Sequence, residues 1–397
     1  MPNNWKTYKL SDFIDINPLV KLKANQSYSF VEMKDLDANL KTVRPSDFKT
    51  LKGGAKFQNN DTLFARITPC LENGKICQVR DLENNVGFGS TEFLVFRGKE
   101  NISDSDFVYY LSREPFVRQF AEANMIGTSG RQRVAKEAFQ NIELELPPVQ
   151  EQKSIASILS AIDDKIENNL AINKTLEEMA MALYKHWFVD FGPFQDGEFV
   201  DSEIFGINNS VSIPKNFKIL NIKEEIIRLK PKNKYTQDNI LKLGKIRVYD
   251  QSSARILGFH NNEPDFNADF ENPLLIFGDH TCRMELICEN FSVGPNLIPF
   301  KTNIKDYTYL VYLALKDKVK MNDYKRHWSE LMLHQFVVPN EIHLLDDFNN
   351  LVKEFFNLIN KNELENQTLT QLRDTLLPKL ISGEVRLKGF REESITN

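Results

Sequence analysis

The chain has 397 residues, of which 41% are hydrophobic and 26% charged, ordinary proportions for a folded protein of two or three domains. Its formal net charge of −5 excludes a histone-like basic protein, so any nucleic-acid surface must be local. No apolar run approaches the roughly 18 residues of a membrane span, and the polar amino terminus lacks a signal-peptide core. Four cysteines are too few for a disulfide framework, so we expect a cytoplasmic protein with no membrane partner.

The first region of the chain has a mixed α/β pattern. Apolar runs bounded by turn signals predict strands at residues 62–67, 75–79, 92–96 and 142–146. Residues 107–120 predict one helix. Gly87-Phe88-Gly89 is a GxG without a flanking βαβ frame, and we interpret it as a turn.

A long helix is predicted between Pro147-Pro148 and Gly192-Pro193. Its apolar residues recur in alternating steps of four and three, the heptad pattern of a coiled coil, although an ordinary core helix can carry a similar stripe. Two asparagines interrupt the seam, and such asparagines fix register and partner at a cost in stability. The seam consists of Ile155, Leu159, Ile162, Ile166, Asn169, Asn173, Leu176, Ala180 and Leu183.

The second region follows a polar, glycine-bearing stretch at residues 196–212, which we interpret as a linker. It again predicts strands, at residues 274–277, 286–288 and 336–338, and a helix at 307–319. A second long helix follows, which we expect Pro378 to end or bend. Its seam consists of Phe348, Val352, Phe355, Ile359, Asn362, Asn366, Leu369, Arg373 and Leu376.

The two regions match each other in order, which indicates an internal repeat. Matched residues are 212 positions apart near the amino terminus and 192 or 193 apart at the helices. The second copy is therefore shorter than the first within one stretch. Two equivalent helices pairing antiparallel about a pseudo-twofold axis would bring Asn169 to Asn366 and Asn173 to Asn362. The matches are Pro2 with Pro214, Cys70 with Cys282, Cys77 with Cys288, Pro147 with Pro339, Asn169 with Asn362, and Asn173 with Asn366.

Motifs for catalysis are missing from the sequence. Gly74-Lys75 is no Walker A loop, and the six histidines form no HExxH pattern. The spacing of the cysteines is too wide for a zinc knuckle, so we expect no metal site and no catalytic residue. A site assembled from distant residues would escape this search.

Basic residues gather locally, which favours contacts with nucleic acid, although many such runs are only solvated surface. Residues 214–255 hold 11 Lys and Arg against 4 Asp and Glu. Two clusters precede the strand that leads into each helix. Arginine and glutamine can bond base edges in pairs, and glycine allows close approach. The first cluster contains Ser129, Gly130, Arg131, Gln132 and Arg133; the second contains Lys325, Arg326 and His327. The remaining candidates for DNA contact are Lys56, Arg66, Lys75, Lys230, Lys232, Lys234, His280, Thr281 and Arg283.

These features resemble the specificity (S) subunit of type I restriction-modification enzymes over essentially the whole chain. Residues 146–152 (LPPVQEQ) are similar to the family's central conserved region, and residues 187–191 (WFVDF) to its end. Residues 376–384 (LLPKLISGE) resemble the distal conserved region, and 275–281 (LIFGDHT) a segment common in target-recognition domains. One departure concerns the helix ends, which carry Tyr184-Lys185-His186-Trp187 in one copy and Leu377-Pro378-Lys379-Leu380 in the other.

The resemblance implies a mixed α/β chain in which two target-recognition domains are held apart by two long helices, paired as an antiparallel coiled coil. The domains would occupy residues 1–148 and 214–342, the conserved helices 149–191 and 343–385, the linker 192–213 and a tail 386–397. Each domain would read one half of a bipartite site in double-stranded DNA. The helices would dock two methyltransferase (M) subunits, and motor-nuclease (R) subunits would join them. S-adenosylmethionine, ATP and Mg²⁺ would bind these partners, with no cofactor in this chain.

Two other functions fit the sequence less well. One is a stand-alone DNA-modifying enzyme with an unrecognised active site, which methyl transfer by the isolated chain would reveal. The other is a coiled-coil scaffold that never touches DNA, which salt-dependent DNA binding would exclude.

Overall fold

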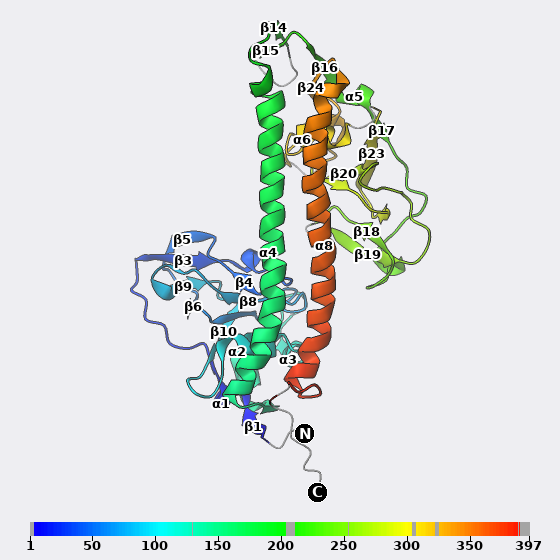
Figure 1. Cartoon of the computed structure of the whole chain (residues 1–397). Coiled ribbons are helices and arrows are strands. Elements are labelled where there is room, and N and C mark those ends of the chain that lie inside the picture. Colours follow the sequence, from blue (N-terminus) through cyan, green and yellow to red (C-terminus); the bar gives the residue numbers. More distant parts are fainter. Residues whose placement is uncertain are drawn as a thin grey trace. The chain divides into compact units, whose positions relative to one another are not determined.

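The computed structural model describes residues 4–128, 130–203, 211–252, 254–303, 307–321, 325–387 and 389. The chain forms two compact units. Unit 1 comprises Met1–Asn169 and Leu364–Asn397, and unit 2 comprises Leu170–Glu363. Two long helices, α4 (Val149–Phe188) and α8 (Asp346–Ile381), contribute one part to each unit (Figure 1).

The β structure of the described part of unit 1 consists of two sheets, a short ladder and the two-stranded hairpin of β11 (Met125–Ile126) and β12 (Arg133–Val134). Its strands β7 (Thr62–Ala65) and β8 (Ile76–Val79) are buried at every position, as expected for the largely apolar runs that form them. The ladder pairs β1 (Lys6–Lys9) with β13 (Glu143–Leu146), the strand that leads into α4. The larger sheet has the order β2 (Ile14–Ile16), β10 (Phe93–Gly98), β7 (Thr62–Ala65), β8 (Ile76–Val79), β4 (Thr42–Val43). The second has the order β5 (Asp47–Thr50), β3 (Ser27–Val31), β9 (Val86–Gly89), β6 (Ala55–Gln58), with β3 and β9 parallel.

Short helices cover the larger sheet of unit 1 and join it to the long helices. They are α1 (Leu10–Phe13), α2 (Ser105–Arg113) and α3 (Pro115–Ala123). The side chain of Asp104 caps α2 by accepting from the backbone N–H groups of Asp106 and Phe107. One core cluster contains Phe64 and Phe96 of the sheet, Phe107 of α2, Leu159 of α4 and Leu380 of α8. These apolar contacts therefore fix the sheet of unit 1 to its portions of both long helices.

Unit 2 also contains a ladder and two larger sheets. Its ladder pairs β16 (Phe217–Asn221) with β24 (Gln335–Pro339). One sheet has the order β17 (Ile226–Arg228), β23 (Leu297–Thr302), β20 (Leu274–Gly278), β21 (Met284–Ile287). The other has the order β19 (Ile256–His260), β18 (Ile246–Tyr249), β22 (Phe291–Val293), with β18 and β22 parallel.

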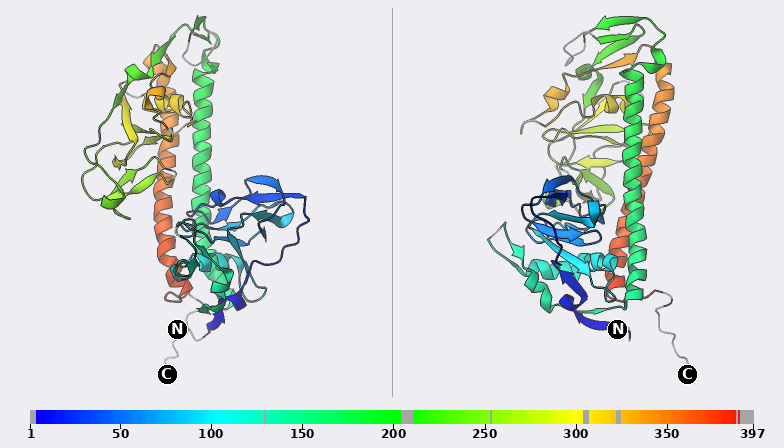
Figure 2. Two further views of the ribbon diagram at one scale, coloured as in Figure 1. Left: turned by 180° about the vertical axis from the view of Figure 1, so that it is seen from behind. Right: turned by 90° about the vertical axis from the view of Figure 1, so that its left-hand side faces the viewer.

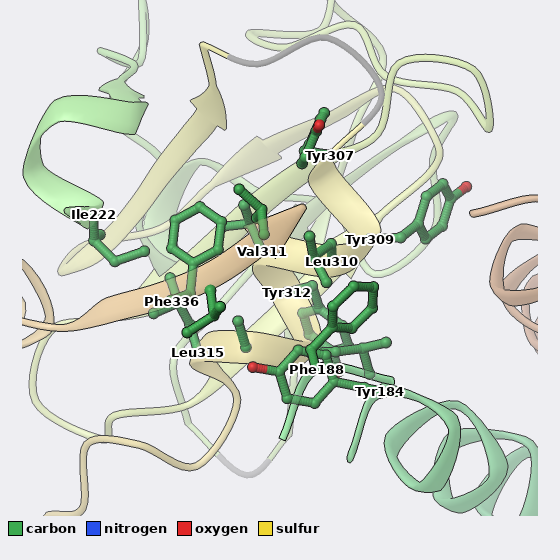
Figure 3. Close-up of a cluster of buried hydrophobic side chains, with 14 of the residues drawn as sticks. Tyr184, Phe188, Ile222, Tyr307, Tyr309, Leu310, Val311, Tyr312, Leu315 and Phe336 are labelled. Carbon is green, nitrogen blue, oxygen red and sulfur yellow. The ribbon is translucent and has the colours of Figure 1, made fainter. Parts of the chain in front are cut away.

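The core of unit 2 surrounds α6 (Thr308–Leu315), whose eight residues are all buried. A helix that is apolar on every side must be enclosed, and α6 lies against Tyr184 and Phe188 of α4 and Phe336 of β24 (Figure 3). The shorter helices α5 (Ile222–Glu225) and α7 (Trp328–Leu331) also contribute buried residues to this unit.

Within each unit the portions of α4 and α8 pack side by side and run in opposite directions (Figure 2). In unit 1, Asn169 contacts Asn366 and Asp163 contacts Arg373. In unit 2, Asn173 contacts Asn362, and the Phe188 and Phe348 rings lie 4.8 Å apart. No helix among the described residues is long and apolar enough to cross a membrane.

Several local predictions are corrected by the structure. The single helix expected at 107–120 is two helices, because Glu114 precedes Pro115 and adopts an extended conformation. Gly87-Phe88-Gly89 is strand β9 and not a turn. A Cβ atom on Gly89 would lie 2.4 Å from the Val31 carbonyl oxygen, so close strand packing explains the glycine. The helix predicted at 307–319 is shorter, since α6 ends at Leu315.

The linker and the second long helix also differ from expectation. Residues 199–202 form β14 (Phe199–Ser202), which pairs with β15 (Val211–Pro214), so this polar stretch is partly a β ladder. Residues 204–210 lie outside the described residues. Of the two outcomes expected at Pro378, an end of the helix is not found, because α8 continues to Ile381 with Pro378 inside it.

Candidate nucleic-acid interface

The seam asparagines pair across the helices within each unit. In unit 1 the Asn169 Nδ2 atom donates to Asn366 Oδ1 at 2.8 Å and to Glu365 Oε2 at 2.7 Å. In unit 2 the Asn362 Nδ2 atom donates to Asn173 Oδ1 at 2.8 Å, and Asn173 Nδ2 donates to the Ile359 carbonyl at 3.4 Å. Polar side chains inside an apolar seam are thus bonded to each other, which avoids the cost of leaving them unsatisfied.

A buried ion pair stands further along the seam of unit 1. Arg373, which replaces an apolar residue in the heptad pattern, donates to Asp163 at 2.8 Å, and both side chains are buried. Tyr110 of α2 donates its hydroxyl to the same carboxylate at 2.6 Å. Arg373 also reaches the Asn39 carbonyl at 3.3 Å, so one polar network connects both long helices to the domain.

The first basic cluster lies around the hairpin of β11 (Met125–Ile126) and β12 (Arg133–Val134) in unit 1. Two backbone contacts attach it to the turn after β7: Thr68 N–H donates to the Gln132 carbonyl at 3.0 Å, and Gln132 N–H donates to Thr68 Oγ1 at 3.1 Å. The Arg131 side chain is exposed, and Gly130 has a φ of +78°. Ser129 lies outside the described residues.

Arg133 and Lys75 are held by contacts within the protein. Arg133 forms a forked ion pair with Glu92 at 2.7 to 2.9 Å, and these hydrogen bonds raise the pKa of Arg133. Lys75 Nζ donates to the Met33 carbonyl at 2.9 Å. Both side chains therefore serve the fold of unit 1, and a DNA contact would compete with these bonds.

Arg66 and Lys56 have a different environment, because both line one cleft of unit 1. Arg66 follows β7 directly and is half-buried. Among the described residues, its Nε atom is buried without a hydrogen-bond partner.

The second basic cluster lies in unit 2 beside the turn between β20 and β21. The backbone N–H of His327 donates to the Asp279 carbonyl at 2.9 Å, and a ring nitrogen of His280 lies 3.0 Å from the Lys325 carbonyl. Lys325 is exposed, and Arg326 is 79% exposed, with its Nε atom 3.8 Å from Asp279. The structure therefore brings residues 279–283 and 325–327 together, far apart as they are in sequence.

His327, Thr281 and Arg283 are not free surface groups. His327 is fully buried, with a ring nitrogen 3.2 Å from Glu330, so its predicted contact with DNA does not fit the structure. The hydroxyl oxygen of Thr281 is buried. Arg283 donates to the Ser252 carbonyl at 2.5 Å and pairs with Glu285, while burial lowers its pKa. Lys230, Lys232 and Lys234 are exposed on the segment between β17 and β18.

Supporting residues at both places were absent from the sequence prediction. Glu92 and Thr68 orient the first cluster, whereas Asp279 and Gln251 orient the second, where Gln251 Oε1 accepts from the His280 N–H at 3.1 Å. Nothing in their local sequence marks them, because each contact joins residues 29 or more positions apart. Of these four residues, Asp279 is the one that the sequence could have suggested, because it is next to the predicted candidate His280.

Cysteine and acidic residues do not gather into a metal centre in the part of the chain that the structure describes. All four cysteines are free thiols, and burial raises the pKa of both Cys77 and Cys288 to about 12. A thiol with such a pKa stays protonated at neutral pH and is a poor nucleophile.

The sequence and fold have known relatives. Residues 2–178 match the model of the family described as the type I restriction modification DNA specificity domain. Specificity subunits are the non-catalytic DNA-recognition subunits of type I enzymes, so the resemblance seen in the sequence is confirmed.

Three relatives show the extent of the similarity. The MjaIX specificity subunit of Methanocaldococcus jannaschii is 24% identical over 318 residues, which cover 72% of this chain and 70% of that subunit. The HindI specificity subunit of Haemophilus influenzae is 32% identical over 197 residues, covering 48% of this chain and 42% of that subunit. The crystal structure of a type I S subunit from M. genitalium shares the fold, with a TM-score of 0.52, 16% identity, and coverage of 95% of this chain and 96% of that one.

Proposed function

We propose that this chain is the specificity subunit of a type I restriction-modification enzyme and reads a bipartite target in double-stranded DNA. Residues 1–148 and 214–342 act as its two target-recognition domains, and the helical regions 149–191 and 343–385 act as the spacer between half-sites. Residues 192–213 link the copies, and 386–397 form a tail.

The observation that carries this proposal is the same junction in each unit. In unit 1 the turn after β7 bonds to the cluster at Arg131 and Gln132. In unit 2 the turn after β20 bonds to the cluster at Lys325 and Arg326. Each junction leaves an exposed arginine next to a fixed backbone, which suits the reading of base edges.

Corresponding strands support the reading of the units as pseudo-twofold copies. Each copy has an antiparallel ladder feeding a long helix, β1 with β13 and β16 with β24. Each also has a parallel pair within its second sheet, β3 with β9 and β18 with β22. The long helices would then form an antiparallel coiled coil in which the asparagine pairs set the register.

Exposed apolar residues on the long helices support docking of two methyltransferase subunits. On α4, Ile158, Ile172 and Met179 are exposed and fall in one heptad phase. On α8 the same holds for Leu351, Leu358 and Leu372. In unit 1 the same heptad position is occupied by Lys165 on α4 and Glu365 on α8, whose charged groups pair at 3.1 Å. Apolar stripes of this spacing are suited to partner helices. Motor-nuclease subunits would complete the enzyme, with S-adenosylmethionine, ATP and Mg²⁺ bound by the partners.

The test is to map methylated adenines in host DNA after co-expression of the chain with its methyltransferase subunit. We expect one motif made of two short half-sites with a fixed spacer, and no such motif from the methyltransferase subunit alone. The purified chain by itself should transfer no labelled methyl group to DNA. A contiguous motif would contradict the bipartite reading, and methyl transfer by the lone chain would establish an enzyme instead.

A further inference from the structure

A cleft of about 420 Å³ opens in unit 1 between residues of its two sheets. Lys56 of β6 lines it from one sheet, and Phe93 and Val95 of β10 line it from the other. Arg66 and the loop after β2 complete the wall. The cleft is thus built by strands and adjoining residues, and not by one flexible loop.

The charge of this cleft is unusual for the protein. Lys56 and Arg66 face it, and no aspartate or glutamate is among its lining residues. Four other cavities of the described residues each include at least one carboxylate in their lining. Cations without carboxylates make the cleft a site for an anion.

Arg66 is held in place with its charge uncompensated. Its backbone N–H donates to the Glu92 carbonyl at 3.0 Å, and its carbonyl accepts from the Val134 N–H at 2.9 Å. The carboxylate of Glu92 accepts the forked bond from Arg133. No ion pair is formed by Arg66 or Lys56 within the described part of the chain. A half-buried guanidinium in this state is stabilised by binding an anion.

The loop after β2 contributes apolar side chains to the lining and is also held by hydrogen bonds. Asn17 anchors its loop, because its N–H donates to the Val95 carbonyl at 2.7 Å and its Oδ1 accepts from the Val95 N–H at 2.9 Å. Leu19 follows on this loop at the cleft and is 84% exposed, while Val20 beside it is buried. The anion that fits must therefore carry an apolar part next to its charge.

We propose that the cleft holds a segment of the sugar–phosphate backbone of DNA, with a phosphate on Arg66 and Lys56 and a deoxyribose against Leu19. This inference rests on the proposed function and adds that Arg66 and Lys56 contact a phosphate and not a base. A concave cleft fits the convex backbone of a duplex, whereas base edges lie inside a groove and are read by groups that protrude into it. Arg131 is exposed, whereas Arg66 is half-buried in the lining of the cleft.

Salt dependence of DNA binding tests this assignment. The full chain assembled with its methyltransferase subunit is titrated with duplex DNA carrying its own methylation motif, between 50 and 200 mM salt. The affinity for DNA falls as the salt concentration rises over this range. Each lost phosphate contact should make this fall about 3.5-fold smaller. We expect one such step for Arg66→Gln and for Lys56→Gln, and two for the double variant. Arg66→Lys should keep most of the contact, since a phosphate accepts a point charge.

A matched control is Arg44→Gln, which removes one positive charge from the residue that follows β4, an edge strand of the larger sheet of unit 1. Arg44 is exposed and already paired with Asp81 at 2.7 Å, so its loss should leave the salt dependence unchanged. Thermal unfolding of every variant checks that the fold is kept, and Lys56→Gln serves if Arg66→Gln fails to fold.

The outcomes separate this inference from the function on which it rests. An unchanged salt dependence in both single variants would overturn the phosphate site, even if the wild-type complex binds its motif tightly. A relaxed base preference in one half-site for Arg66→Gln, not rescued by lysine, would show that the cleft reads bases and would also overturn it. Failure of the wild-type complex to bind the motif would contradict the proposed function itself.

Discussion

Arg131 and Arg326 are the exposed arginines of the two basic clusters, and each stands beside a backbone fixed by hydrogen bonds. Their neighbours differ from them: Arg133 is engaged by Glu92, and His327 is buried. From the sequence alone, all members of a cluster are equal candidates for DNA contact. The structure distinguishes exposed side chains from those whose contacts support the fold. This distinction decides which substitutions should alter recognition.

We expect Arg131→Ala to relax or abolish recognition in one half-site and Arg326→Ala in the other. A lost bidentate base contact should cost about 1–3 kcal/mol at that position. The spacer length should not change if, as we propose, the helices set it. Mapping methylated sites for each variant checks this, with Arg44→Gln as the control. If both variants alter the same half-site, or neither alters any, these arginines do not read DNA.

Cys77 offers a test of packing inside unit 1. Its side chain is fully buried, burial raises its pKa to about 12, and its Sγ lies 3.2 Å from the Asp37 carbonyl. We expect iodoacetamide at pH 8 to modify it only as fast as unit 1 opens, whereas partly exposed Cys70 reacts sooner. Mass spectrometry of timed samples measures both rates. Equal rates in the native chain would contradict the described packing.

At the scale of elements, the long helices were predictable because a heptad repeat is local. The seam predicted a helix between Pro147-Pro148 and Gly192-Pro193, and α4 spans Val149–Phe188. The order of the strands was not predictable, since β3 pairs in parallel with β9 through residues such as Phe30 and Phe88. The Arg133–Glu92 pair is equally non-local. Local sequence patterns therefore predict individual helices and strands. The pairing of distant segments can be seen only in the folded chain.

The helix seam gives a prediction about register and pH. Replacing Asn169 and Asn366 together by leucine should keep or raise the unfolding temperature while loosening register, because the bonded amides are exchanged for apolar contact. The matched control is the same double replacement by leucine at Asn173 and Asn362, the pair in unit 2. Calorimetry gives the stability, and disulfide trapping between cysteines introduced on facing helix positions gives the register. A large loss of stability would show that the amides stabilise the fold instead.

The same substitution should change the acid response of unit 1. Hydrogen bonds from Asn169 and Lys165 lower the pKa of Glu365 from its ordinary value of 4.5. A carboxylate with a lowered pKa stabilises the fold above its unfolded pKa, and that stabilisation disappears as pH falls through the folded pKa. Without Asn169 the pKa of Glu365 should rise toward 4.5, so the stability lost as pH falls below this value should become smaller. An unchanged slope of unfolding free energy against pH would contradict this.

At the scale of the whole molecule, unit 1 is built from both ends of the sequence. Arg386 forms a forked ion pair with buried Glu151 at 2.7 and 2.9 Å, and Trp5 donates to the same carboxylate at 3.2 Å. Leu377, Leu380 and Ile381 of α8 are buried in its core. Residues 1–169 therefore lack part of their core unless α8, or something equivalent to it, lies beside α4.

A fragment of residues 1–191 should consequently self-associate through α4. Removing α8 uncovers Leu159, Ile162 and Ile166, and a second copy of α4 can cover them in the antiparallel sense. Asn169 and Asn173 hold the same seam positions as Asn362 and Asn366, so Asn169 of one copy would meet Asn173 of the other. Sedimentation should show a dimer that Ile162→Lys disrupts and Lys174→Asp, on the exposed face, does not.

This dimer should be weaker than the pairing within the intact chain, for a reason that lies at the helix ends. Tyr184, Trp187 and Phe188 of the second copy would have to enter the space that Leu377, Leu380 and Ile381 fill in unit 1, and the larger rings overpack it. Tyr184→Leu with Trp187→Leu should therefore tighten the dimer. With a methyltransferase subunit the fragment should modify a palindrome made of one half-site repeated. A folded, strictly monomeric fragment would contradict the repeat on which this argument depends.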